Sequence, residues 1–164
     1  MKRFHSDQGN LARHFSDATR HVRGSDVLYD EEGAILKSNM VNPGKACKTG
    51  YTVDEIAIAN LQVFRRCFPT AMVTANFLSG GQSLEDAAAR LDAINKHKTA
   101  KDPWNLSFSW SAALQMPLFQ LCKETGELQL EAMGELYMKE LAIAGAAATG
   151  THTRSGTEGD HVPK

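Results

Sequence analysis

The chain of 164 residues has few cysteines, almost no net charge and no long apolar run. Its three cysteines, Cys47, Cys67 and Cys122, are scattered, which argues against a disulfide framework and against a zinc site. A formal net charge of -1 gives no electrostatic reason to bind nucleic acid or an acidic membrane surface. No apolar run could span a bilayer, and no apolar signal core follows Met1. We therefore expect a reduced, cytoplasmic protein without a metal or other cofactor.

The remaining composition is that of an ordinary globular domain, with 42% hydrophobic and 23% charged residues. Residues 1–33 are expected to form an N-terminal helix, around 9–22, followed by an acidic loop. The histidines in this region, His5, His14 and His21, could bind a metal. Because no carboxylate pattern accompanies them, a solvated helix face is the preferred interpretation.

The stretch 77–83, Phe-Leu-Ser-Gly-Gly-Gln-Ser, joins an apolar run at 71–78 to a helix start. Ser83, with Asp86 three residues later, is typical of a capping box that opens a helix. The predicted order is therefore strand, glycine turn and helix. Two adjacent glycines permit positive φ and a close approach of backbone to ligand, and free amides at a helix start attract an anion. A tight turn that binds nothing is the alternative.

Further strand and helix patterns alternate along residues 34–150. Strands are predicted at 34–41, 71–78 and 105–110, and helices at 52–67, 83–96, 112–122 and 127–148. Pro117 should kink or break the third of these helices. Such alternation favours a parallel sheet with helices packed on it, either an open α/β sheet or part of a barrel. Residues 151–164, rich in Gly, Thr, Ser and charge, are expected to be a disordered tail.

Polar residues stand at or near the carboxyl end of each predicted strand, where α/β folds place their chemistry. Lys37 lies inside the apolar run 34–41, where loss of water would help to deprotonate an amine and make it nucleophilic toward a carbonyl. A surface lysine on an edge strand is an equally good interpretation. Together with the turn at 79–81 and the segment 109–111, Lys37 suggests a ligand that carries both a carbonyl and a phosphate.

With these residues assembled, the chain resembles the C-terminal part of class I fructose-bisphosphate aldolases. The matching stretches agree in order and spacing across roughly 33–150, and they are 35–41, 43–44, 46–47, 77–83, 91–96, 103–109 and 113–115. The resemblance implies a TIM barrel and a ketose bisphosphate substrate handled through a lysine Schiff base. It also implies roles for single residues.

By position, Lys37 matches the Schiff-base lysine of that family. Ser79 and Gly80 match residues that hold one substrate phosphate, and Ser109 matches a serine beside the substrate. Their neighbours are included in the predicted substrate site, namely Leu78, Gly81 and Ser111. The implied ligand is a phosphorylated sugar or a triose phosphate.

The chain also departs from the family pattern. Ser111 and Ala112 stand where the family has a glycine and a phosphate-binding arginine, and Ser38 replaces the usual proline after the lysine. The tail lacks the tyrosine that closes the family's site. The first strands of the barrel, with the acidic residues and lysine that move protons, have no counterpart here. A complete barrel takes about 250 residues, so the predicted fold is a partial TIM barrel of about three strand-helix units plus a C-terminal helix.

Two other functions compete with the enzyme. One is an aldolase-derived binding or structural fragment without catalysis, whose open strand edges favour self-association or a partner chain that supplies the missing strands. The other is an ABC-type ATPase, whose signature pentapeptide is the Leu-Ser-Gly-Gly-Gln of residues 78–82. That assignment needs a glycine-rich phosphate loop upstream and an apolar strand ending in Asp downstream, and neither is present.

Overall fold

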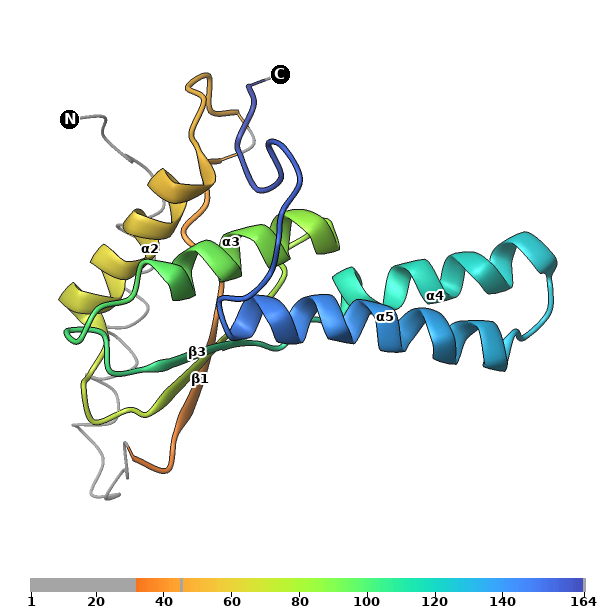
Figure 1. Ribbon diagram of the computed structural model, residues 1–164, viewed down its shortest axis with the longest axis horizontal. Coiled ribbons are helices and arrows are strands. Elements are labelled where there is room, and N and C mark those ends of the chain that lie inside the picture. Colours follow the sequence, from red (N-terminus) through yellow and green to blue (C-terminus); the bar gives the residue numbers. More distant parts are fainter. Residues whose placement is uncertain (1–31, 45, 164) are drawn as a thin grey trace.

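A parallel three-stranded sheet organises the computed structural model, which describes residues 32–44 and 46–163 (Figure 1). The predicted helix at 9–22 lies outside these residues. The strands occur in the order β1-β2-β3, each followed by a helix. The elements are β1 (Ile35–Ser38), α2 (Val53–Cys67), β2 (Thr74–Phe77), α3 (Leu84–Lys96), β3 (Asn105–Phe108), α4 (Ala112–Thr125) and α5 (Leu130–Ala148). Three parallel strand-helix units and a final helix agree with the predicted α/β fold and are consistent with part of a barrel.

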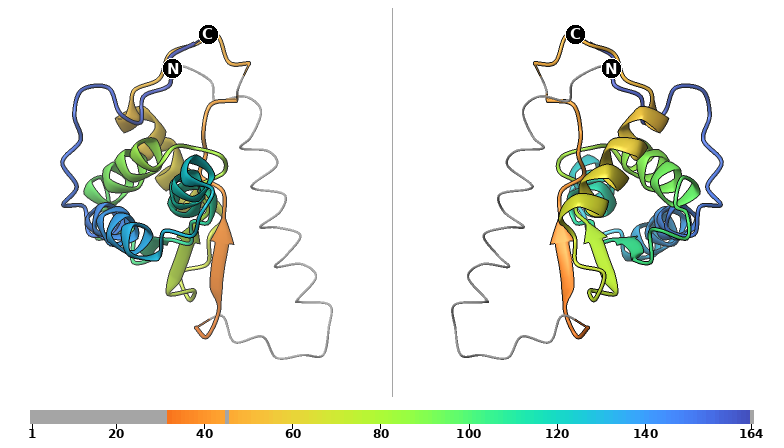
Figure 2. Two further views of the ribbon diagram at one scale, coloured as in Figure 1. Left: turned by 90° about the vertical axis from the view of Figure 1, so that its right-hand side faces the viewer. Right: turned by 90° about the vertical axis from the view of Figure 1, so that its left-hand side faces the viewer.

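The two faces of this sheet have opposite characters. Helices α2, α3 and α5 lie on one side of the sheet (Figure 2). Ala75, Phe77 and Leu106 are fully buried, in one core cluster with residues of these helices. On the other face Lys37 pairs in register with Asn76, and Asn76 with Ser107. Lys37 is exposed and the other two are half-buried. The sheet therefore covers a core with one face and presents polar side chains on the other.

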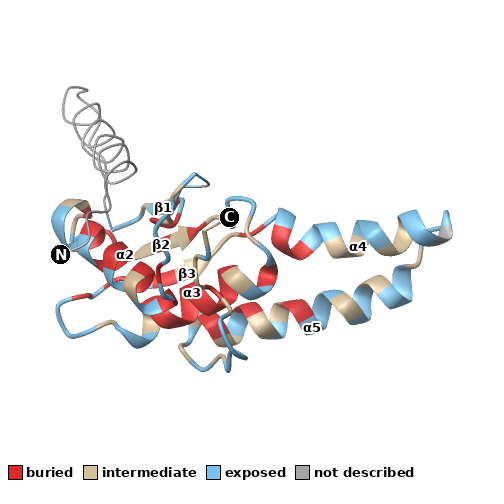
Figure 3. Ribbon diagram, turned by 90° about the horizontal axis from the view of Figure 1, so that it is seen from above, coloured by how far each residue is buried: buried red, intermediate tan, exposed pale blue. Residues whose placement is uncertain are grey.

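The core lies between the sheet and the helices α2 and α3, where the buried residues concentrate (Figure 3). Helix α2 begins with a capping box, in which Glu55 N–H donates to Thr52 Oγ1 at 3.2 Å and Thr52 N–H donates back to Glu55 Oε2 at 3.0 Å. Its Phe64 ring packs against Phe77 and Trp104, with centroids 5.5 and 5.8 Å away. These contacts fix α2 over the middle of the sheet.

Helices α4 and α5 form an antiparallel pair that projects beyond the sheet (Figure 1). Pro117 lies inside α4, yet the helix continues to Thr125 instead of breaking, since a single proline removes only one backbone donor. The predicted helix at 127–148 begins later, at Leu130. Among the apolar residues of this region, Ala144 is buried and Leu141 and Ala148 pack partly buried against the core, whereas Leu128 and Ala132, at the outer end, are exposed.

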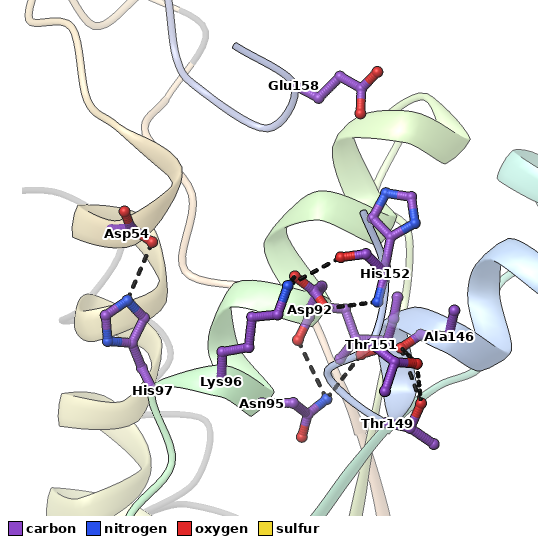
Figure 4. Close-up of polar contacts among 12 residues, drawn as sticks. Asp54, Asp92, Asn95, Lys96, His97, Ala146, Thr149, Thr151, His152 and Glu158 are labelled. Carbon is purple, nitrogen blue, oxygen red and sulfur yellow. Dashed lines mark hydrogen bonds and ion pairs between the residues drawn. The ribbon is translucent and has the colours of Figure 1, made fainter. Parts of the chain in front are cut away.

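Residues 151–163 differ from the disordered tail that their composition predicts. The structure places them against the starts of α2 and α3, where Tyr51 and His161 exchange backbone hydrogen bonds of 3.1 and 2.7 Å. Farther along α3, Asp92 accepts from the His152 amide at 3.0 Å and Lys96 donates to the His152 carbonyl at 2.9 Å (Figure 4). Polar groups of this C-terminal segment thus find charged and backbone partners that composition does not reveal.

Candidate functional site at the carboxyl edge of the sheet

The carboxyl ends of the three strands bring most of the predicted site residues to one edge. Hydrogen-bonded pairing continues past the strands: Leu78 N–H donates to the Ser38 carbonyl, and Ser109 N–H donates to the Phe77 carbonyl, each at 2.8 Å. Lys37 lies one residue before Ser38, so it stands beside the start of the glycine turn. Residues 37, 78 and 109, far apart in sequence, therefore share one edge of the sheet.

The turn at 79–81 has the geometry that its glycines predict. Gly80 has a φ of +61° and Gly81 a φ of +79°, both in the left-handed region. A β-carbon on Gly80 would stand 2.6 Å from Asn39 Oδ1, whereas one on Gly81 would meet nothing within 4 Å. Both glycines are exposed and Ser79 is buried. The turn thus presents backbone to solvent while it packs against the segment after β1.

Helix α3 begins directly after this turn. Ser83 caps it, since Asp86 N–H donates to Ser83 Oγ at 3.1 Å, and this part of the predicted capping is confirmed. The free amides of a helix start lie where an anion could approach the turn. Glu85 and Asp86, in the first turn of the helix, work against such an anion by charge repulsion.

Lys37 does not have the environment expected from its apolar neighbours. Its side chain is exposed on the open face of the sheet, and Ile35, on the same face, is 65% exposed. The apolar run at 34–41 suggested that Lys37 is buried. Because side chains of a strand alternate between the two faces of a sheet, Lys37 lies on the face opposite the one that the helices cover. In the described part of the chain, Lys37 is therefore exposed to solvent instead of enclosed among apolar side chains.

The two serines after β3 differ in their exposure to solvent. Ser109 is half-buried at the sheet edge, and Ser111 is exposed. Ser111 makes no capping hydrogen bond to α4 through its side chain, and its hydroxyl donates to Gln115 Oε1 at 2.8 Å. Ala112 is the first residue of α4, so no guanidinium extends from this position.

Several residues near this edge were not among the predicted site residues. Asn39 packs on Gly80, and Asn76 lies in register with Lys37. Residues two apart in a strand lie on the same face of the sheet, so the alternation places Asn76 on the same face as Leu78 and could have indicated it. Gln82, which donates from Nε2 to the Ser79 carbonyl at 2.7 Å, gave no such signal.

The described residues contain no group of three His, Cys, Asp or Glu side chains placed to hold a metal ion. Within the same described part of the chain, no helix is both long and apolar enough to cross a membrane.

The comparisons with known proteins agree with one another. The glycolytic family described as fructose-bisphosphate aldolase class-I matches residues 14–162. Fructose-bisphosphate aldolase C from Pan troglodytes is 41% identical over 128 residues, which is 78% of this chain and 35% of that protein. Aldolase C-A from Danio rerio is 40% identical over 125 residues, covering 76% of this chain and 34% of that protein.

A solved structure gives the same result. Fructose-bisphosphate aldolase from Plasmodium falciparum, in a ternary complex with TRAP and a small-molecule inhibitor, superimposes with a TM-score of 0.78 and 27% identity. The match covers 90% of this chain and 41% of that one. The α/β fold is thus similar to that of the aldolase barrel, and the ATPase alternative finds no support. The chain spans about a third of the length of the curated relatives, and it belongs to the class I fructose-bisphosphate aldolase family.

Proposed function

We propose that this chain carries the lysine and the phosphate turn of a class I fructose-bisphosphate aldolase site. The reaction of the family is the reversible cleavage of fructose bisphosphate to dihydroxyacetone phosphate and glyceraldehyde phosphate, in glycolysis. The observation that carries the proposal is the 2.8 Å hydrogen bond from Leu78 N–H to the Ser38 carbonyl, because it holds the turn beside Lys37. The proposed setting is the cytoplasm.

In this proposal Lys37 forms the covalent bond to substrate. Its neutral amine attacks the carbonyl carbon, a C–N double bond forms, and the oxygen leaves with the two amine protons as water. The amides of Gly80 and Gly81, with Ser79, hold the phosphate. Leu78, Ser109 and Ser111 line the remainder of the substrate site.

Cleavage also needs groups that move protons. In the family these groups lie on earlier strands of the barrel, which this chain does not match. We therefore expect the isolated chain to form the Schiff base slowly and to turn over fructose bisphosphate only when the remaining strands are supplied.

A second candidate function is a binding or structural fragment derived from an aldolase. The exposed Lys37 favours it, as do the large apolar side chains left uncovered on α4 and α5, among them Met116, Phe119 and Met138. Such surfaces, and the outer edges of β1 and β3, which pair with no further strand among the described residues, would promote self-association or pairing with a chain that supplies strands. Light scattering that gives a monomer of 17.9 kDa with a cooperative melt would argue against this candidate.

Borohydride trapping tests the enzymatic proposal. The chain is incubated with dihydroxyacetone phosphate, reduced, digested and mapped by peptide mass spectrometry. We expect one adduct at Lys37 that is lost in Lys37→Met and kept in the control Lys48→Met, which removes another exposed lysine. Adducts spread evenly over surface lysines would contradict the assignment of Lys37 and favour the binding fragment.

A further inference from the structure

Three hydrogen bonds connect the glycine turn to a segment about eighty positions later in the chain. Gln82 Nε2 donates to the Ser79 carbonyl at 2.7 Å, and Gln82 Oε1 accepts from Arg90 Nη1, also at 2.7 Å. The Nε of the same arginine donates to the Gly159 carbonyl at 2.7 Å. A continuous polar path therefore runs from the turn through α3 to the C-terminal segment.

Arg90 is the central member of this path. The residue is only 7% exposed on α3, and burial lowers the pKa of its guanidinium, while the charges of Asp86 and Asp160 act in the opposite direction. A buried guanidinium is tolerated when its donors are satisfied. Here two nitrogens of one rigid planar group contact two separate partners, which the single ammonium of a lysine does not reproduce.

The far end of the path is sterically fixed. Gly159 has a φ of +82°, and a β-carbon there would stand 2.7 Å from Val53 Cγ2 and 3.0 Å from Ala89 Cβ. Its amide donates to Asp86 Oδ1 at 3.0 Å, next to the start of α3. The segment is thus held close against both helices, and its Gly159 carbonyl shares the Arg90 guanidinium with Gln82.

We propose that Arg90 is a positioning residue that couples the docking of residues 151–163 to the conformation of the Ser79–Gly81 turn. The coupling rests on the proposed function only in that the turn is taken as the phosphate site. Because coupling between two sites is reciprocal, an anion bound at the turn stabilises the docked segment, and loosening the segment weakens anion binding.

Hydrogen exchange of the full chain without ligand tests the coupling. Arg90→Lys keeps the charge but breaks the two-sided contact, and Gln82→Met breaks the path at its other end. The matched control is Lys96→Met, which removes another contact of α3 with the same segment, at the His152 carbonyl. Thermal melts confirm that each variant is folded.

The expected pattern separates coupling from simple loss of stability. Arg90→Lys and Gln82→Met should speed exchange about tenfold in both 78–83 and 157–161, as for the loss of one hydrogen bond to a charged group. Lys96→Met should speed exchange only around 151–154. Unchanged exchange at the turn in Arg90→Lys, or equal acceleration there in Lys96→Met, would overturn the proposal.

A second hydrogen-exchange experiment adds inorganic phosphate, and it tests the proposed phosphate site separately from the ligand-free comparison. In the wild type, phosphate should slow exchange at the turn and also in 157–161, and Arg90→Lys should abolish the second effect. Protection of the turn alone would contradict the coupling. If phosphate protects neither region, the phosphate site of the proposed function fails, while the coupling is still decided by the ligand-free comparison.

Discussion

Asn39 and Gly80 are in such close contact that a β-carbon at residue 80 would stand 2.6 Å from Asn39 Oδ1. This contact joins the segment after β1 to the glycine turn after β2. It makes the two glycines of the turn unequal: both have positive φ, but only Gly80 has a neighbour within 4 Å of the added atom.

The first prediction uses this difference. Gly81→Ala should lower the free energy of unfolding by about 1–2 kcal/mol through the left-handed φ alone. Gly80→Ala should lower the free energy of unfolding by more, because Asn39 must also move. Asn39→Gly, combined with Gly80→Ala, should recover only this additional loss. Urea unfolding of the three variants and the double variant measures the difference. Equal costs for the two alanine variants would show that the contact carries no energy.

Asp102 provides a prediction on pH. Arg65 donates to it twice, from Nε to Oδ1 and from Nη2 to Oδ2, each at 2.6 Å, and these bonds together with those from Thr99 lower the pKa of Asp102 to about 2. A lowered carboxyl pKa stabilises the fold above its ordinary value of 3.8, and this contribution is lost as pH falls toward 2. Asp102→Asn should cost about 2 kcal/mol at neutral pH.

The control for this prediction is Asp54→Asn, which removes the exposed partner of His97. Its effect on unfolding should be within about 0.5 kcal/mol. The wild type and Asp54→Asn should both lose stability between pH 4 and 2, and Asp102→Asn should lose less over that range. Parallel pH curves for wild type and Asp102→Asn would refute the assignment.

Glu140 should behave in the opposite way. It is 5% exposed on α5, and its buried Oε2 has no hydrogen-bond partner within residues 32–44 and 46–163. Burial, followed by the charge of Glu85, raises the pKa of Glu140. A raised carboxyl pKa costs stability above the folded value and nothing below the unfolded value. Glu140→Gln should therefore raise the melting temperature at neutral pH but not below about pH 4. Glu131→Gln, at an exposed position of the same helix, should change neither.

Ala112 supplies a prediction on affinity. At the start of α4 it follows the serine-containing end of β3, where the family has a phosphate-binding arginine. Ala112→Arg should tighten the binding of dihydroxyacetone phosphate by about one to two decades, the value of a charge-assisted hydrogen bond of about 1.5–3 kcal/mol. Calorimetric titration measures it, with Ala142→Arg on α5 as the control for added charge. Equal gains in affinity in both variants would show that the added positive charge, and not a contact beside the turn, causes the effect.

Local rules in the sequence predicted most of the fold. The predicted helix at 52–67 begins where expected, with Thr52 as its N-cap, since the capping chemistry of Thr52 and Glu55 is complete within four residues. The glycines at 80 and 81 likewise predicted a turn with positive φ. Parallel strand order followed from the alternation of elements and the long connections between strands.

Features that depend on distant contacts could not be predicted in this way. The exposure of Lys37 depends on which face of β1 the helices cover, and an apolar run does not specify that face. The order of residues 151–163 depends on partners such as Asp92 and Tyr51, which are about sixty and more than a hundred positions away. The hydrogen bonds of Arg90 to Gln82 and Gly159 could not be predicted for the same reason, because no sequence pattern connects these three residues.

Lys37 and the glycine turn are proposed to form one site for a phosphorylated carbonyl compound. Amide NMR spectra of the labelled chain, recorded during titration with dihydroxyacetone phosphate and followed by borohydride reduction, test this proposal most directly. The Gly80 and Gly81 amides should shift at the same ligand concentrations at which the adduct forms at Lys37, and Lys37→Met should abolish the adduct but keep a weaker shift. Adduct formation at Lys37 with no change at the glycine amides would contradict the proposal.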